Sequence, residues 1–270
     1  MSKIEKALER AKAMRGDGQP EIEHGQQAPE TVSDRAPQVR YTQTKVVDLN
    51  RGHLERHRLM TLVDNPDAVD QYNLLRTQVL LRTREKGHNV LMVTSVLDGE
   101  GKTITAINLA TSIAREVKQT VLLVDTDLRH PRIHRYLGTA MEKGLSDYLQ
   151  HGTPVSDLLV NPGLSGMVVL MAGKPLLGST EVLGSPKMEN LVKEMKRRYP
   201  DRYVIFDCPP LLTVPDALVF SSYVDGVILV VEAGRTPKDQ IRKAVELLEG
   251  RHIVGLVLNR AQGSHYGYYY

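Results

Sequence analysis

A glycine-rich turn between an apolar run and a helix-like pattern constrains this chain more than any other feature. The run Val90–Val93 is typical of a buried strand, and the turn DGEGKT follows it at residues 98–103. Backbone N–H groups and the dipole at the start of a helix attract an anion such as a phosphate. Lys102 adds a positive charge there, and the hydroxyl of Thr103 is placed to reach Mg²⁺. The segment therefore predicts a loop that binds the phosphates of a nucleotide.

The loop departs from the usual pattern at one position. A small residue usually stands five places before the glycine of Gly-Lys-Thr, and this chain has Val96 there. Because the core from Gly99 to Thr103 is complete, nucleotide binding is still expected. The residues predicted to bind ATP are Asp98, Gly99, Glu100, Gly101, Lys102, Thr103 and Ile104.

Composition excludes several classes of protein. Apolar residues make up 41% of the 270 residues, which is enough for a sizeable core. The single cysteine, Cys208, excludes an internal disulfide framework and suits a reducing compartment. The net charge of +3 is too small to indicate a nucleic-acid partner, so none is expected. No apolar run approaches the roughly 20 residues of a membrane span, which predicts a cytoplasmic protein.

The composition changes along the chain and predicts four parts. Residues 1–15 are predicted to form an amphipathic docking helix, although a solvated helix without a partner fits the same pattern. Residues 16–44 are rich in Gly, Pro, Gln and Glu and are predicted to form a flexible linker. Residues 45–264 are predicted to be the folded domain, and residues 265–270 a tyrosine-rich tail.

Short apolar runs alternate with helix-like patterns through the predicted domain. The predicted strands are residues 90–95, 121–125, 167–171, 203–207, 227–231 and 253–258. The predicted helices are residues 67–84, 102–116, 187–198 and 237–249. This alternation indicates an α/β fold, with a mostly parallel sheet and helices on both of its faces. Ligands of such sheets bind at the carboxyl ends of the strands.

Three aspartates stand at the ends of predicted strands. Asp125 ends one strand, Asp127 follows it on the same side in extended geometry, and Asp207 ends another strand. Each alone fits the common role of a helix cap or a loop bond. Together, beside a phosphate loop, they indicate an Mg²⁺–nucleotide site. The predicted metal ligands are Thr103, Asp127 and Asp207. The predicted catalytic residues are Lys102, Asp125 and Asp127, with Asp125 favoured as the base.

Three motifs together resemble the bacterial tyrosine kinase family, whose members are P-loop kinases related to the MinD/ParA ATPases. They are the phosphate loop, the segment VLLVDTDLRHP at residues 121–131 and the segment VIFDCPP at residues 204–210. The N-terminal SKIEKALERAK followed by a linker resembles the soluble tyrosine autokinases of exopolysaccharide loci. The resemblance implies a protein tyrosine autokinase that uses ATP and Mg²⁺ and regulates exopolysaccharide biosynthesis or export.

The tyrosine-rich tail agrees with that resemblance. Four of the eleven tyrosines of the chain are Tyr266, Tyr268, Tyr269 and Tyr270. They are predicted to be the phosphate acceptors, with burial in a core or display to a partner as weaker alternatives. A phenol with a pKa of about 10 is a poor nucleophile until its proton is removed, so the acceptors need a base.

The resemblance also implies partners and a location. It implies a membrane-spanning chain-length determinant, or polysaccharide co-polymerase, whose cytoplasmic tail activates the kinase. It further implies a cognate tyrosine phosphatase, a homo-oligomer, and a peripheral position at the inner membrane through the partner. The chain departs from the family at the helix used for subunit contacts, where the usual Glu-x-x-Arg-x-x-Arg is represented by Asp70, Asn73 and Arg76.

Two other functions fit parts of the same sequence pattern. A MinD/ParA-type switch ATPase without kinase activity shares the phosphate loop, but such ATPases carry an extra lysine where this chain has Leu97. A non-enzymatic scaffold with a relic site is suggested only by Val96. The tyrosine tail favours the kinase over both.

Overall fold

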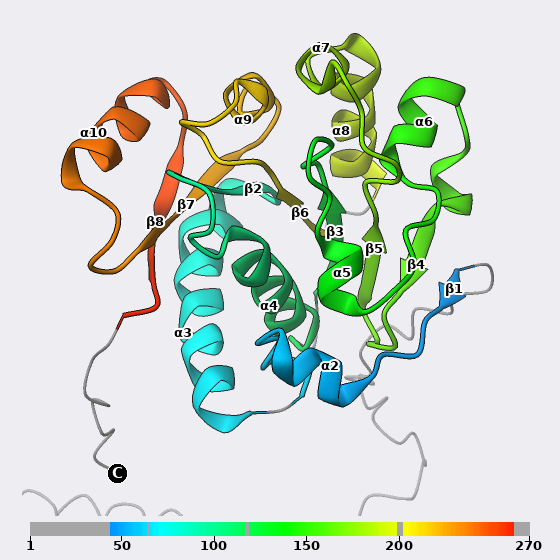
Figure 1. The fold of residues 1–270 in the computed structure, drawn as a ribbon, viewed down its shortest axis with the longest axis horizontal. Helices are drawn as coiled ribbons and strands as arrows, with labels where there is room; N and C mark the ends of the chain where they lie inside the picture. The colour runs from blue at the N-terminus through cyan, green and yellow to red at the C-terminus, as the bar shows by residue number, and fades with distance from the viewer. Residues whose placement is uncertain (1–43, 64, 117–118, 199–201, 262–270) are drawn as a thin grey trace, which may run out of the picture. The chain divides into compact units, whose positions relative to one another are not determined.

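The structure is a computed structural model that describes residues 44–261, apart from 64, 117–118 and 199–201. Within these residues eight strands form one sheet in the order β1-β4-β5-β3-β6-β2-β7-β8 (Figure 1). The strands are β1 Lys45–Val46, β2 Val90–Ser95, β3 Thr120–Asp125, β4 Leu159–Asn161, β5 Met167–Leu170, β6 Arg202–Asp207, β7 Gly226–Glu232 and β8 Ile253–Asn259. Neighbouring strands are parallel except β4 and β5, which confirms the predicted mostly parallel sheet.

Helices cover both faces of this sheet, as predicted (Figure 1). One apolar cluster packs the sheet against α2 Arg51–Arg56, α3 Pro66–Thr83, α4 Lys102–Ala114 and α5 Ile133–Leu137. A second cluster packs the other face against α6 Leu145–His151, α7 Ser179–Leu183, α8 Pro186–Arg198, α9 Asp216–Phe220 and α10 Lys238–Leu247. Two 3₁₀ turns are Arg84–Lys86 and Val155–Asp157.

The predicted elements are confirmed to within a few residues, because each has a clear local signal. All side chains of β2 are buried, as expected of a continuous apolar run. Helix α3 begins after Asn65, whose side chain accepts a hydrogen bond from the Ala68 N–H, and Pro66 occupies the first turn. The prediction missed β1 and β4 and the short helices, which span too few residues to show a period.

Two of the three α3 residues that the resemblance assigns to subunit contacts, Asn73 and Arg76, make contacts inside the chain. Asn73 accepts a hydrogen bond from the Ser112 hydroxyl at 3.0 Å. Arg76 donates to the Ser112 carbonyl at 2.9 Å, and its guanidinium lies 3.4 Å from Glu116. These contacts hold α3 against α4, and the predicted homo-oligomer stays a prediction.

Several predictions fall outside the described part of the chain. The docking helix at residues 1–15, the tail at residues 265–270 and all but one residue of the linker at 16–44 lie there. The four-part division therefore stays a prediction. Among the described helices, none has the length and apolar character that a membrane crossing needs.

Candidate functional site

Two of the three predicted aspartates are brought side by side by the register of the sheet. Asp125 at the end of β3 is the register partner of Asp207 at the end of β6. Side chains alternate along a strand, and Leu123 and Ile205, two residues earlier, belong to the apolar cluster shared with α4. Both carboxylates therefore lie on the α4 side of the sheet, at the carboxyl ends of the strands.

The phosphate loop turns into α4 through two glycines with left-handed backbones. Gly99 has φ +83° and Gly101 has φ +95°, values that glycine adopts readily and other residues rarely. Gly101 is also tightly packed, because a Cβ atom built on it would lie 2.1 Å from Nδ2 of Asn259. The loop therefore needs glycine at residue 101 for both conformation and space.

Glu100 holds the loop to the rest of the domain. Its carboxylate accepts hydrogen bonds from the Leu97 N–H at 2.8 Å and from the Thr236 hydroxyl, and its carbonyl accepts one from Asn259 Nδ2 at 2.7 Å. Glu100 was predicted to bind ATP, but its carboxylate is directed into the protein. Thr236 and Asn259 were not among the predicted site residues. The available signal was a polar residue, Asn259, that closes the last apolar run.

Other residues of the predicted loop take distinct positions. Val96 is fully buried in the core, on the face opposite α4, so its branched side chain points away from the phosphate turn. Its presence is thereby explained. Asp98 lies 3.4 Å from the Arg132 guanidinium, and Ile104 packs against the cluster under α4.

Lys102 contacts two of the three aspartates of the site. Its Nζ donates to Asp127 Oδ2 at 2.9 Å and lies 3.8 Å from Asp207 Oδ1. Lys102, Thr103, Asp127 and Asp207 are all buried. Burial lowers the pKa of Lys102, but the charges of Asp207 and Asp127 outweigh it and raise that pKa above its usual value. The lysine therefore stays charged where a phosphate would bind.

Asp207 has a fully buried carboxyl group, and a cation bound beside it would offset the cost of that burial. Neither of its oxygens accepts a hydrogen bond from the described residues. Burial raises its pKa to about 6, and Lys102 acts against this shift. One lysine faces three carboxylates, so a divalent cation fits the site. No group of three or more His, Cys, Asp or Glu side chains in the described residues suits a metal by itself. Mg²⁺ takes much of its shell from water and substrate phosphates, and so needs no such group.

Asp125 accepts hydrogen bonds from the backbone and also has a raised pKa. It accepts backbone N–H bonds from Asp127 at 3.2 Å, Arg132 at 3.2 Å and Ile133 at 3.1 Å. Burial and the neighbouring charge of Asp207 raise its pKa to about 8. Asp125 thus anchors the loop after β3 and can also take up a proton near neutral pH.

The raised pKa of Asp125 predicts a pH-dependent stability. A carboxyl with a pKa of about 8 in the folded state and about 4 unfolded binds more protons when folded. Its contribution is complete below pH ~4 and is lost as the pH rises through about 8. Between pH 5 and 8 the nucleotide-free chain should lose stability relative to Asp125→Asn, by up to about 1.4 kcal/mol per pH unit.

Chemical denaturation at several pH values measures this difference. Asp216→Asn is the contrasting variant, because the pKa of Asp216 lies below its usual value. Asp216 is therefore ionised in both states over that range, and the difference between wild type and this variant should stay constant. A wild type that gains stability over Asp125→Asn with rising pH would contradict the prediction.

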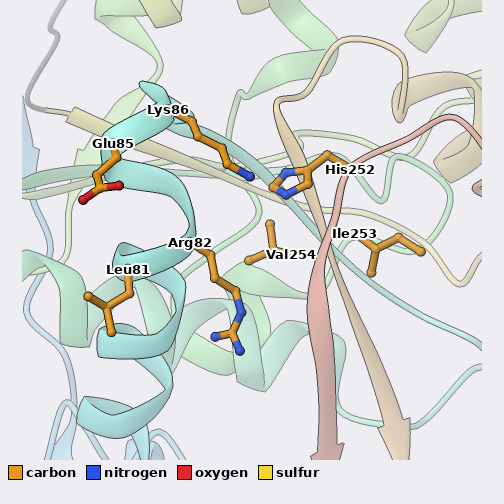
Figure 2. A pocket seen from close by; sticks show the side chains of 7 residues that line it. All are labelled: Leu81, Arg82, Glu85, Lys86, His252, Ile253 and Val254. Atoms are coloured by element: carbon orange, nitrogen blue, oxygen red, sulfur yellow. The ribbon is translucent and has the colours of Figure 1, made fainter.

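A hollow on the described surface belongs to another region. It has a volume of about 410 Å³ and is lined by the end of α3, the turn after it and residues 252–254 at the start of β8 (Figure 2). Figure 2 shows the Lys86 amine directed toward the His252 ring. Strand starts lie at the edge of the sheet opposite to Asp125 and Asp207, so this hollow is not part of the candidate site.

Comparison with known proteins places the chain among nucleotide-binding kinases. Residues 88–246 match the AAA domain family. The chain is similar to the tyrosine-protein kinase YwqD of Bacillus subtilis, with 32% identity over 227 residues that cover 82% of this chain and 94% of that protein.

Solved structures agree with this match. The kinase domain of the Escherichia coli tyrosine kinase ETK is 31% identical with a TM-score of 0.66, covering 75% of this chain and 80% of that one. The septum site-determining protein MinD of Pyrococcus horikoshii, complexed with Mg-ADP, has a TM-score of 0.55 and 23% identity, covering 66% of this chain and 72% of that one. That second likeness shows the fold alone.

Proposed function

Because the chain belongs to the family of bacterial tyrosine-protein kinases, we propose that it transfers the γ-phosphate of ATP to tyrosines in its own tail. One observation carries the proposal: a charged, buried lysine and three aspartates meet where the phosphate loop opens α4. Phosphoryl transfer depends mainly on positioning and on neutralising phosphate charge, and this group of residues is suited to both.

Different groups of the phosphate loop bind different parts of the nucleotide–Mg²⁺ complex. The backbone N–H groups from Gly99 to Ile104 cradle the phosphates at the start of α4, and Lys102 leaves Asp127 to contact them. Thr103, Asp127 and Asp207 hold Mg²⁺, directly or through water. When bound there, the ion would supply positive charge against the phosphate charge that develops during transfer.

Asp125 is the proposed base. In the transfer step the phenol oxygen forms a bond to the γ-phosphorus, the bond from that phosphorus to the bridging oxygen breaks, and ADP leaves. The phenol proton passes to the Asp125 carboxylate. Its raised pKa of about 8 supports this role, because it lies nearer to the phenol pKa of about 10 than that of an ordinary carboxyl does.

Replacing the acceptors tests the proposal directly. The chain in which Tyr266, Tyr268, Tyr269 and Tyr270 are all changed to Phe should lose at least about nine tenths of its phosphate incorporation while still binding ATP. Mass spectrometry after incubation with ATP and Mg²⁺ measures this loss. Tyr223→Phe is the control, because its ring packs against Phe220 and Phe preserves that contact. Undiminished phosphorylation of the fourfold variant would contradict the assignment of the tail.

The same experiment separates the kinase from a switch ATPase. ATP hydrolysis by wild type without phosphate on any tyrosine would favour the ATPase. The comparisons do not favour that alternative, because relatives above 30% identity are named tyrosine kinases.

The proposed setting follows the family resemblance. The kinase acts in the regulation of exopolysaccharide synthesis or export, bound at the inner membrane to the cytoplasmic tail of a membrane-spanning chain-length determinant. A cognate phosphatase removes the tail phosphates. Co-purification of the full chain with such a membrane protein tests the partner.

A further inference from the structure

The loop after β3 carries two arginines that engage opposite sides of the site. Arg132 reaches Asp98 in the phosphate loop, at 3.4 Å. Arg129 reaches Asp216, the first residue of α9, at 3.1 Å. Helix α9 packs on the sheet face opposite to the face that α4 covers. Arg129 is therefore held toward α9, while Arg132 is held toward the phosphate loop.

Asp216 is built to hold this arginine in place. It is fully buried and accepts hydrogen bonds from the Ser179 hydroxyl at 2.5 Å and the Thr180 hydroxyl at 2.6 Å, as well as from Nε and Nη2 of Arg129. Burial acts to raise the pKa of Asp216, but the bonds from Arg129, Ser179 and Thr180 outweigh it, so the carboxyl stays ionised. Thr180 also accepts a hydrogen bond from Arg129 Nη2 at 3.0 Å.

One end of the Arg129 guanidinium is left for another ligand. Its hydrogen bonds to the described residues come from Nε and Nη2, and its side chain is 36% exposed. The backbone on either side is fixed, because the His130 N–H donates to Asp127 at 3.0 Å and the Leu176 N–H donates to the Leu128 carbonyl at 2.9 Å. A guanidinium held in this way loses little freedom when it binds a phosphate.

The tail sequence indicates which phosphate this is. Residues 262–270 read QGSHYGYYY and contain no Asp or Glu. Within this segment, the tyrosines would each carry a charge of about −1.5 to −2 once the proposed transfer has phosphorylated them. The close spacing of the four tyrosines places a first phosphate within a few residues of the next acceptor.

We propose that Arg129 binds a phosphotyrosine of the tail while a neighbouring tyrosine occupies the transfer site, with Asp216, Ser179 and Thr180 as positioning residues. The inference rests on the proposed transfer to tail tyrosines. Each further transfer breaks the same ATP bond, sends the phenol proton to Asp125 and releases ADP. The first phosphate thereby promotes the second, and the tail accumulates several phosphates.

Intact-mass spectrometry of the full chain during autophosphorylation tests this inference. Arg129→Gln should accumulate singly phosphorylated chain. At equal total phosphate, its ratio of doubly to singly phosphorylated chain should be about tenfold below that of wild type. A factor of this size is what the loss of one hydrogen bond to a charged group produces. Asp216→Asn should shift the ratio in the same direction, and Arg129→Lys should restore part of it. Arg135→Gln, which removes an exposed arginine of α5, should match wild type.

Comparing chains at equal total phosphate separates order of phosphorylation from overall rate. An unchanged ratio in Arg129→Gln overturns the inference, even if its rate falls. A wild type without tail phosphate overturns the proposed function and this inference with it.

Peptide binding gives a second readout that does not depend on turnover. A peptide of residues 262–270 phosphorylated on Tyr269 should bind wild type about tenfold tighter than the unphosphorylated peptide. Arg129→Gln should lose that preference, and equal preference in both proteins would overturn the inference.

Discussion

Lys102→Met is expected to reduce tyrosine phosphorylation by about a thousandfold, the scale on which one preorganised charge at a transferring group acts. Lys102 is the only cation within 4 Å of Asp127 and Asp207 among the described residues, and it lies at the start of α4 where the phosphates bind. Methionine preserves much of the side-chain length and removes the charge. Phosphate incorporation into the tail, followed by mass spectrometry, measures the loss.

The same variant should change how stability depends on pH. Without the lysine, the buried carboxylates of Asp125, Asp127 and Asp207 lose their cation, and breaking such a buried pair costs about 3–5 kcal/mol when the charges persist. The pKa is about 8 for Asp125 and about 6 for Asp207, so more of these two carboxyls is protonated at pH 5.5 than at pH 8, and the cost should be smaller at pH 5.5. Thermal unfolding at the two pH values measures the difference.

An exposed lysine supplies the control for both effects. Lys143→Met removes the same charge from an exposed position and should leave transfer and the pH dependence unchanged. Tail phosphorylation at the wild-type rate in a folded Lys102→Met chain would refute the assigned role of the lysine.

Gly101→Ala is expected to weaken nucleotide binding by at least about a hundredfold. The new Cβ atom would lie 2.1 Å from Asn259 Nδ2, and the residue would keep a φ of +95° that alanine rarely adopts. Either the Asn259 side chain or the loop must therefore shift. Both movements break the Asn259 bond to Glu100, which holds the loop, and strain at residue 101 displaces the backbone N–H groups proposed to cradle the phosphates. The strain at the left-handed backbone alone costs about 1–2 kcal/mol, and the clash adds to it.

Gly234→Ala separates these two causes. Gly234 also has a left-handed φ, of +70°, but a Cβ atom there would meet nothing within 4 Å. This variant should lose about 1–2 kcal/mol of stability and still bind nucleotide. Titration with a fluorescent ATP analogue, together with thermal unfolding, distinguishes the two. Normal ATP affinity in Gly101→Ala would show that the loop tolerates the displacement.

Local sequence patterns were enough to predict some features of the site. The buried run at β2, the Gly99-to-Thr103 turn and the start of α4 are adjacent in sequence, so the phosphate loop was predicted with its bounds. Asp125 and Asp207 were predicted as strand ends, because each closes an apolar run. Thr236 and Asn259 were missed, since they contact Glu100 across more than 130 residues of sequence.

The sequence by itself therefore determined the α/β fold and the position of the phosphate loop between β2 and α4, and the residues assigned to nucleotide and Mg²⁺ stay predictions. These features depend on hydrophobic period and on contiguous backbone geometry, which are local properties. Only the tertiary structure decided that Val96 points into the core, that the Glu100 carboxylate bonds to Leu97 and Thr236, and that Asp216 holds Arg129. Each of these depends on strand register and on packing between distant segments, and register is set by the whole buried sheet.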